Sequence, residues 1–252
     1  MINVPNSIKE ALSMNERSDS FNKSKDSLNI STRTEDFNKT DSKINNYNNR
    51  AKFNNSIDNK EKVRIYDNLP KGQSIIRGQK ISLSKLNPSI NDIDVCITYK
   101  TSNNLYDLDS EAFLLGENEK VLGEDYFVFY NQKATPDNAV KYLSNDSEKI
   151  INVKLKELNE KVKKIVFVLT INEAIKNNLN FSGVSNAIVK VIDKSQNKEL
   201  VRFELTEYYK EVISMMVGEI YFKNGEWRFN AIGNGTKDDL SGLCSRFGVD
   251  AY

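Results

Sequence analysis

The sequence of 252 residues contains no histidine, two cysteines and a single tryptophan. Imidazole is the usual proton carrier of Ser-His-Asp and Cys-His catalytic groups and a common ligand of zinc and other transition metals. The missing histidine therefore excludes those catalytic groups and most such metal sites, which leaves hard cations held by oxygen. Cys96 and Cys244 form no Cys-x-x-Cys motif, so we expect both to be small buried apolar residues.

The sequence has almost no net charge, because it contains 36 basic and 35 acidic residues. Nucleic-acid binding needs clustered Lys and Arg, and no basic stripe occurs, so nucleic acid is not an expected partner. No apolar run reaches the roughly 18 residues of a membrane span, and Met1–Ser20 lacks the apolar core of a signal peptide. We expect a soluble cytoplasmic protein without direct membrane insertion.

Glycine is absent before Gly72, and the first 60 residues contain 13 Asn and 9 Ser. Such a segment buries too little apolar surface to offset roughly 1 to 2 kcal/mol of backbone entropy per residue. The sequence therefore predicts a disordered Asn/Ser-rich tail over 1–73 and a folded domain over 74–252. A short helix around Ile8–Met14 is an alternative for part of the tail.

Short runs of β-branched and aromatic residues alternate with Gly, Asn and Asp turns after Gly72. This spacing predicts an all-β fold, a two-sheet antiparallel β-sandwich with one or two short helices. The Asn224-Gly225 pair indicates a tight type I′ hairpin, and Lys237–Phe247 has the apolar spacing of a helix. The expected strands are 79–85, 92–100, 111–115, 121–130, 140–143, 150–155, 164–171, 187–193, 200–205, 215–222 and 226–232.

Asp107 and Asp109 are the clearest candidates for a binding site. Side chains alternate on a strand, so both carboxylates project from one face. Their repulsion is about 2 to 3 kcal/mol at an effective dielectric near 20, a cost that a bound divalent cation would convert into a gain. A solvated strand end, where water screens the charges, is the alternative.

Six blocks follow one another in a recognisable order between about Ser74 and the C-terminus. Tyr106-Asp107-Leu108-Asp109-Ser110 is similar to an Asp-x-Asp-Leu-Asp-Ala-Ser signature, with Leu105 in place of its first aspartate. The other blocks are Ile76–Lys85, Phe127–Asn131 with Pro136-Asp137, Ile171–Ala174, Phe181 with Val184–Ala187, and Gly218–Tyr221 with Trp227–Phe229 and Phe247–Val249. Together they resemble the TerD family of bacterial tellurite-resistance and general-stress proteins.

The resemblance implies a β-sandwich that binds Ca²⁺ through acidic loops and acts in resistance to tellurite and chemical stress. It gives no catalytic activity to assign to these residues. It implies that the protein works with paralogous stress proteins and a membrane-associated partner. Since Leu105 replaces an aspartate and the loop Ser144–Glu148 is shorter than in the family, we expect one of two calcium sites to be weak or absent. The implied metal ligands are Asp107, Asp109, Asn131, Asp146, Glu148 and Glu173. Turn formation explains Asn131 nearly as well, and Asn172 in place of a family histidine leaves the role of Glu173 open.

The sequence leaves three hypotheses for the function. The first is a non-enzymatic, calcium-binding module that acts through partners. The second is a metal-dependent enzyme that uses the Asp107 and Asp109 carboxylates on an unknown small substrate. The third is a structural sandwich whose partner is recognised by the tail.

Overall fold

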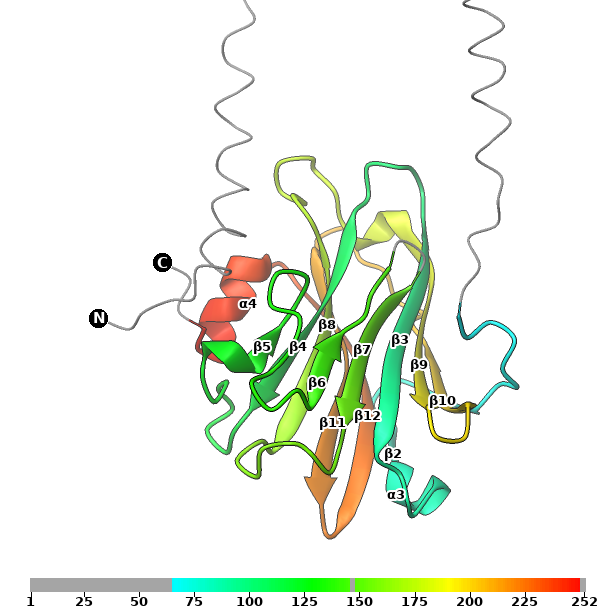
Figure 1. The fold of residues 1–252 in the computed structure, drawn as a ribbon. Helices are drawn as coiled ribbons and strands as arrows, with labels where there is room; N and C mark the ends of the chain where they lie inside the picture. The colour runs from blue at the N-terminus through cyan, green and yellow to red at the C-terminus, as the bar shows by residue number, and fades with distance from the viewer. Residues whose placement is uncertain (1–64, 146–147, 250–252) are drawn as a thin grey trace, which may run out of the picture.

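The computed structural model describes residues 65–145 and 148–249. Within them the chain forms two six-stranded sheets packed face to face, as the sequence predicts (Figure 1). Sheet A runs in the order β1 (Gln73–Ile75), β10 (Lys198–Glu204), β9 (Val184–Asp193), β3 (Asp92–Thr101), β7 (Lys149–Lys154) and β6 (Val140–Tyr142). Sheet B runs β2 (Lys80–Ser82), β12 (Glu226–Thr236), β11 (Ser214–Lys223), β8 (Lys164–Ile171), β4 (Leu108–Leu115) and β5 (Phe127–Val128).

The described residues contain two α-helices, α3 (Leu83–Leu86) and α4 (Leu240–Phe247), and two 3-10 turns, η1 (Glu124–Tyr126) and η2 (Phe181–Gly183). Neither helix is long and apolar enough to cross a membrane. The predicted hairpin at Asn224-Gly225 is confirmed, with φ of 52° and 77° at the two residues. The final helix begins at Leu240, three residues after the predicted start, because Asp239 caps it by accepting a hydrogen bond from the Gly242 N–H at 2.9 Å.

Packed structure begins before the predicted domain boundary at residue 74. Tyr66 is buried, and with Leu69 it packs against Cys96, Ile150 and Ile192 on the outer face of sheet A. Gln73 pairs with Val201 in parallel strands, the one parallel pair among the described strands. The predicted tail up to residue 64, including the helix at Ile8–Met14, lies outside the described residues.

Three apolar clusters build the core, and the alternation of side chains on each strand separates them. The largest fills the space between the sheets, where β4 contributes Leu108, Ala112 and Leu114. A second lies on the outer face of sheet B, where Phe113 and Leu115 of the same strand pack with residues of α4. The third is the Tyr66 cluster on sheet A. Both cysteines are free and buried, as predicted.

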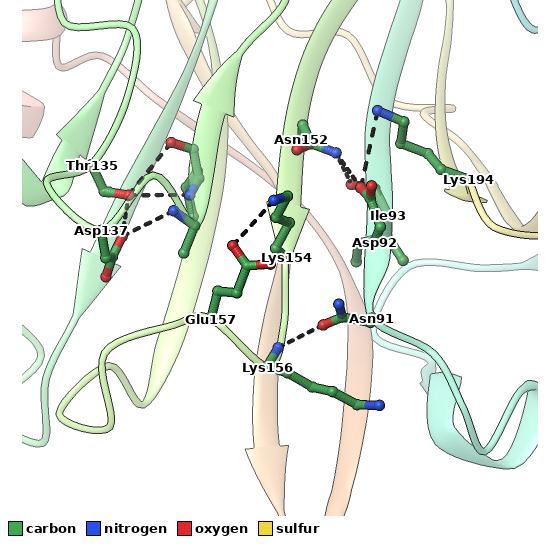
Figure 2. A network of polar contacts seen from close by, with 12 residues as sticks. Asn91, Asp92, Ile93, Thr135, Asp137, Asn152, Lys154, Lys156, Glu157 and Lys194 are labelled. Atoms are coloured by element: carbon green, nitrogen blue, oxygen red, sulfur yellow. Dashed lines mark hydrogen bonds and ion pairs between the residues drawn. The ribbon is translucent and has the colours of Figure 1, made fainter.

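Polar contacts join the strands of sheet A at one end (Figure 2). Asn152 of β7 donates from Nδ2 to Asp92 Oδ1 of β3 at 2.7 Å, and Lys194 Nζ lies 4.0 Å from the same carboxylate. Nearby, the hydroxyl of Thr135 donates to Asp137 Oδ1 at 2.6 Å and fixes the turn that leads into β6. These contacts fix β7 beside β3 and hold the turn that enters β6.

Candidate functional site

The first half of β4 has one edge without a paired strand among the described residues. β5 pairs only with Ala112 and Phe113, whereas β8 pairs with the whole of β4 from Leu108 to Leu115. Since Leu108 faces the main core and Phe113 faces α4, Asp109 and Glu111 project from the outer face of sheet B. Side chains from sheet A can therefore reach Asp109 around this edge.

The loop before β4 is fixed by contacts with the segment after β8. The hydroxyl of Tyr106 donates to the Asn180 carbonyl at 3.0 Å, and a Cβ at Gly183 would lie 1.9 Å from that hydroxyl oxygen. Any larger residue at position 183 would therefore displace the Tyr106 ring. The Asn172 N–H donates to the Asp107 carbonyl at 2.8 Å, and its Nδ2 donates to Asp107 Oδ2 at 3.3 Å. These bonds place Asp107 at the outer surface beside the end of β8.

Asp109 is partly compensated by groups from sheet A. Lys149 Nζ lies 3.5 Å from Asp109 Oδ1, with only 11% and 18% of the two side chains exposed. The hydroxyl of Tyr142 donates to the same oxygen at 3.5 Å. Burial raises the pKa of Asp109, Lys149 opposes that rise, and the charge of Asp107 adds to it. Burial also raises the pKa of Tyr142, to about 12.

Glu111 is the most deeply buried acid of this strand, with 1% of its surface exposed. Its Oε1 accepts from the Thr170 hydroxyl at 2.7 Å, and its Oε2 has no hydrogen-bond partner among the described residues. Burial raises the pKa of Glu111 well above its ordinary value, and the neighbouring charge of Asp109 raises it further. The carboxyl groups of Asp109 and Glu111 thus lie side by side with different partners. Asp109 contacts Lys149 and Tyr142, whereas Glu111 accepts a hydrogen bond from Thr170.

A pocket of about 490 Å³ opens over these two acids. One wall is the turn after β8, and the opposite wall is the first turn of α4 with its cap Asp239. Tyr130 stands at the edge, 37% exposed, and its pKa is raised first by burial and then by the charges of Asp109, Glu111 and Asp107. The lining residues are Asp109, Glu111, Tyr130, Thr170–Lys176 and Asp239–Ser241.

The structure brings three of the predicted metal ligands to this end of sheet B. Asp107 directly precedes β4 and lies close enough to Asp109 for its charge to raise the pKa of that residue, and Glu173 lines the pocket with Asp109. Glu173 has a positive φ of 48° and forms an ion pair with Lys176 at 3.1 Å. Asn131 is exposed and directly follows Tyr130 of the pocket edge.

Glu148 is directed elsewhere, contrary to its predicted place in a common coordination sphere. Its carboxylate accepts from the Ile65 N–H at 2.7 Å and from Cys96 Sγ at 3.6 Å, on the outer face of sheet A. Consecutive residues of an extended chain project to opposite faces, and the next residue, Lys149, is the one that reaches Asp109. The remaining predicted ligand, Asp146, lies outside the described residues.

Glu111 and Thr170 are the site residues that sequence reasoning missed. The pattern Asp107-x-Asp109-x-Glu111 extends the period of two by one more acid, and this signal could have indicated Glu111. Thr170 carries no such signal, because it lies 59 positions away in the sequence and is aligned only by the pairing of β8 with β4.

The donors at this edge are carboxylate, hydroxyl and carboxamide oxygens, which suit a hard cation such as Ca²⁺. Within residues 65–145 and 148–249, no three acidic or thiol side chains converge closely enough to hold a metal ion. A calcium ion at Asp107 and Asp109 would therefore need main-chain carbonyls, carboxamides or water for its remaining ligands.

Comparison with known proteins relates this fold to a defined group. The tellurium resistance protein TerD of Serratia marcescens is 33% identical over 188 residues, which cover 71% of this chain and 98% of that protein. General stress protein 16U of Bacillus subtilis (strain 168) is 32% identical over 187 residues, covering 70% of this chain and 97% of that protein.

The crystal structure of the unknown function protein SAV2460 shares the fold, with a TM-score of 0.50 and 19% identity over 61% of this chain and 94% of that one. The sequence model of the TerD domain matches residues 72–247, which include every described strand of sheet B and all of the pocket. The chain therefore belongs to the TerD domain family, whose relatives named above are tellurium-resistance and general-stress proteins.

Proposed function

We propose that this chain is a non-enzymatic, calcium-binding module of a tellurite-resistance or chemical-stress response system, and that it acts by binding partner proteins. The observation that supports the calcium part is the closeness of Asp107 and Asp109 at the start of β4, where the charge of Asp107 raises the pKa of the partly buried Asp109. Membership of a family with resistance and stress proteins supports the cellular role.

Charge neutralisation is the proposed mechanism. Without the ion, the carboxylates of Asp107 and Asp109 repel each other, and Lys149 offsets part of that repulsion from one side only. When Ca²⁺ is bound, it supplies the charge that closes the acidic loops into one surface. Because Lys149 competes for Asp109 and Glu148 lies on the other face, we expect a single site of modest affinity.

The surface beside this edge has features that suit a protein partner. Leu105, two residues before Asp107, is 66% exposed, and Leu143, next to the Tyr142 that contacts Asp109, is 45% exposed. A bound partner would cover both leucines and remove their apolar surface from water. We propose that paralogous stress proteins and a membrane-associated protein bind here, and that calcium orders the surface they contact.

A thermal melt in calcium against chelator tests the proposal. An ion that binds only the folded protein stabilises it by about 2.7 kcal/mol at 100 times its Kd, which is roughly 5 to 10 °C in Tm for a domain of this size. The double variant Asp107→Asn/Asp109→Asn should remove the shift. Asp125→Asn, which changes an exposed aspartate of η1 in the same way, should keep it. An unchanged Tm for the parent chain would contradict calcium binding.

A further inference from the structure

Glu111 is a buried acid that the fold leaves half satisfied. One carboxylate oxygen accepts a hydrogen bond from Thr170 at 2.7 Å, and the other has no partner within the described part of the chain. Burial of an ionisable group without full compensation is costly, and native proteins retain few such groups. A group that binds at Oε2 would relieve this cost.

The nearest lysine does not serve this purpose. Lys149 lies 3.5 Å from Asp109 Oδ1, and no ion pair of residues 65–145 or 148–249 includes Glu111. Lys149 is ion-paired with Asp109, and its charge acts on Glu111 only from beyond ion-pair distance. The carboxyl oxygen without a partner belongs to a residue that lines the pocket.

The pocket above Glu111 has the size and lining of a small-molecule site. Its volume of about 490 Å³ falls within the range of roughly 300 to 1,000 Å³ found for such sites. Ile171, Ala174, Ile175 and Leu240 supply apolar walls, and the ring of Tyr130 borders the opening. Aromatic faces attract cations, so Tyr130 adds to the same preference as Glu111.

This lining favours an organic cation over a metal ion or an anion. Calcium takes about six to eight oxygen ligands, and no three acidic side chains of the described residues converge closely enough to hold a metal ion. An anion at the first turn of α4 would meet the Asp239 carboxylate that already caps the helix, with Asp109 and Glu111 behind it. An ammonium group on an apolar body matches both the buried acid and the walls.

We propose that this pocket binds a small primary amine in its ammonium form. The ammonium donates to Glu111 Oε2, and the apolar body lies against Ile171, Ala174 and Leu240 below the ring of Tyr130. This inference goes beyond the proposed calcium function, because it assigns a different ligand and a carboxylate that is not among the proposed calcium ligands.

Isoamylamine hydrochloride is a suitable probe, and isoamyl alcohol is its neutral counterpart of the same shape. Binding is measured on the full chain by amide NMR and calorimetry, in chelator and at matched ionic strength. We expect saturable shifts in 170–176 and 239–241, and binding of the alcohol at least about tenfold weaker. Equal binding of amine and alcohol, shifts spread over the whole surface, or no saturable binding would overturn the proposal.

Two variants test the role of the buried carboxyl group. Glu111→Gln keeps the shape and removes the charge, so amine affinity should fall by at least about tenfold. Glu117→Gln, a glutamate with 85% of its side chain exposed at another surface, should leave affinity unchanged. If Glu111→Gln fails to fold, Ile175→Lys at a residue 73% exposed on the pocket wall serves instead, because its added positive charge should weaken amine binding.

The same titrations in calcium separate this proposal from the calcium function. Amine binding that persists while calcium leaves Tm unchanged would contradict the calcium function alone. Displacement of the amine by calcium that disappears in Glu111→Gln would identify the pocket as a metal site and overturn the amine proposal. Amine affinity that Glu111→Gln and Ile175→Lys both leave intact would overturn it as well.

Discussion

The outer faces of the two sheets hold buried acids in opposite ways. On sheet A, Glu199 accepts from both Nε and Nη2 of Arg202 at 2.8 Å, and Asp94 accepts from the Tyr66 hydroxyl and from Asn152 Nδ2. On sheet B, Glu111 accepts a single hydrogen bond and keeps one oxygen without a partner in the described residues. The first face uses its charges to hold segments together.

This difference separates structural charge from charge available to a ligand. Glu199 also accepts from the Gly72 N–H at 2.8 Å, and the Asp94 network includes Tyr66, so sheet A secures the start of the domain with its acids. On sheet B, Asp109 is paired with Lys149, but Glu111 accepts only from Thr170 of the neighbouring strand, and both acids line a pocket. The predictions below test whether the two faces differ as their contacts indicate.

The largest effect should follow loss of the Glu199–Arg202 pair. Arg202→Ala leaves the fully buried Glu199 side chain without its guanidinium, which should cost about 3 to 5 kcal/mol in the free energy of unfolding. Urea unfolding measures the change. Lys237→Ala is the control, because it removes an exposed pair with Glu211 and should leave the free energy of unfolding almost unchanged. An equal loss of unfolding free energy in the two variants would contradict the structural role of the Glu199–Arg202 pair.

A medium effect is expected from Tyr66→Phe. The variant removes one donor to Asp94, which retains Asn152 Nδ2 at 2.7 Å and Lys194 Nζ at 3.9 Å, so unfolding should become easier by about 1 to 2 kcal/mol. Amide hydrogen exchange in 65–72 should accelerate at the same time. Tyr209→Phe, at an exposed tyrosine bonded to Glu207, is the control and should change neither measurement.

The pH dependence of stability should distinguish Glu111 from an ordinary acid. Because its pKa is raised in the folded protein, ionisation is disfavoured there. The wild-type chain should therefore lose stability as pH rises from the ordinary value of 4.5 through the raised pKa, relative to Glu111→Gln, by on the order of 1 kcal/mol or more. Urea unfolding in chelator at about pH 5 and about pH 8 measures this. Parallel pH profiles for the two chains would contradict it, and Glu117→Gln should give the wild-type profile.

The smallest effect concerns the two thiols. Cys96 is buried on the outer face of sheet A, and Cys244 is buried on the outer face of sheet B. Burial raises the pKa of Cys96, under Tyr66, and raises that of Cys244, in α4, to about 12. Both thiols stay protonated at neutral pH, and the thiolate is the reactive form, so a thiol reagent should modify the folded chain only slowly. Peptide mass spectrometry resolves the two sites. Tyr66→Phe should accelerate labelling of Cys96 and leave Cys244 unchanged.

Much of the fold could be predicted because alternating apolar residues record which face of a strand is buried. β8 has its predicted bounds, and the turn at Asn224-Gly225 depends on a local backbone requirement. β1 was not predicted, because three residues are too few to show an alternation of apolar and polar side chains. It forms a strand through its parallel pairing with β10, which is distant in the sequence. β4 begins three residues before its predicted start, because pairing with β8 carries the polar Asp109 and Ser110 into the sheet.

The site was predictable only in part, for a related reason. The period of two placed Asp107 and Asp109 together, since it depends on neighbouring residues alone. The direction of Glu148 depends on which residue of the turn before β7 reaches across to Asp109, and local sequence does not specify this. The pocket arises where β4, the turn after β8 and α4 meet, and these segments are far apart in the chain.

The position of α4 has a consequence for synthesis of the chain. Phe113, Phe127 and Phe129 form a stack with ring centroids 4.4 and 4.6 Å apart, and the helix that packs against them follows every described strand in the chain. Before α4 is made, the apolar side chains beside the two-residue edge strand β5 are open to neighbouring nascent chains. Protection of this edge therefore depends on α4, and chains truncated before Leu240 should aggregate.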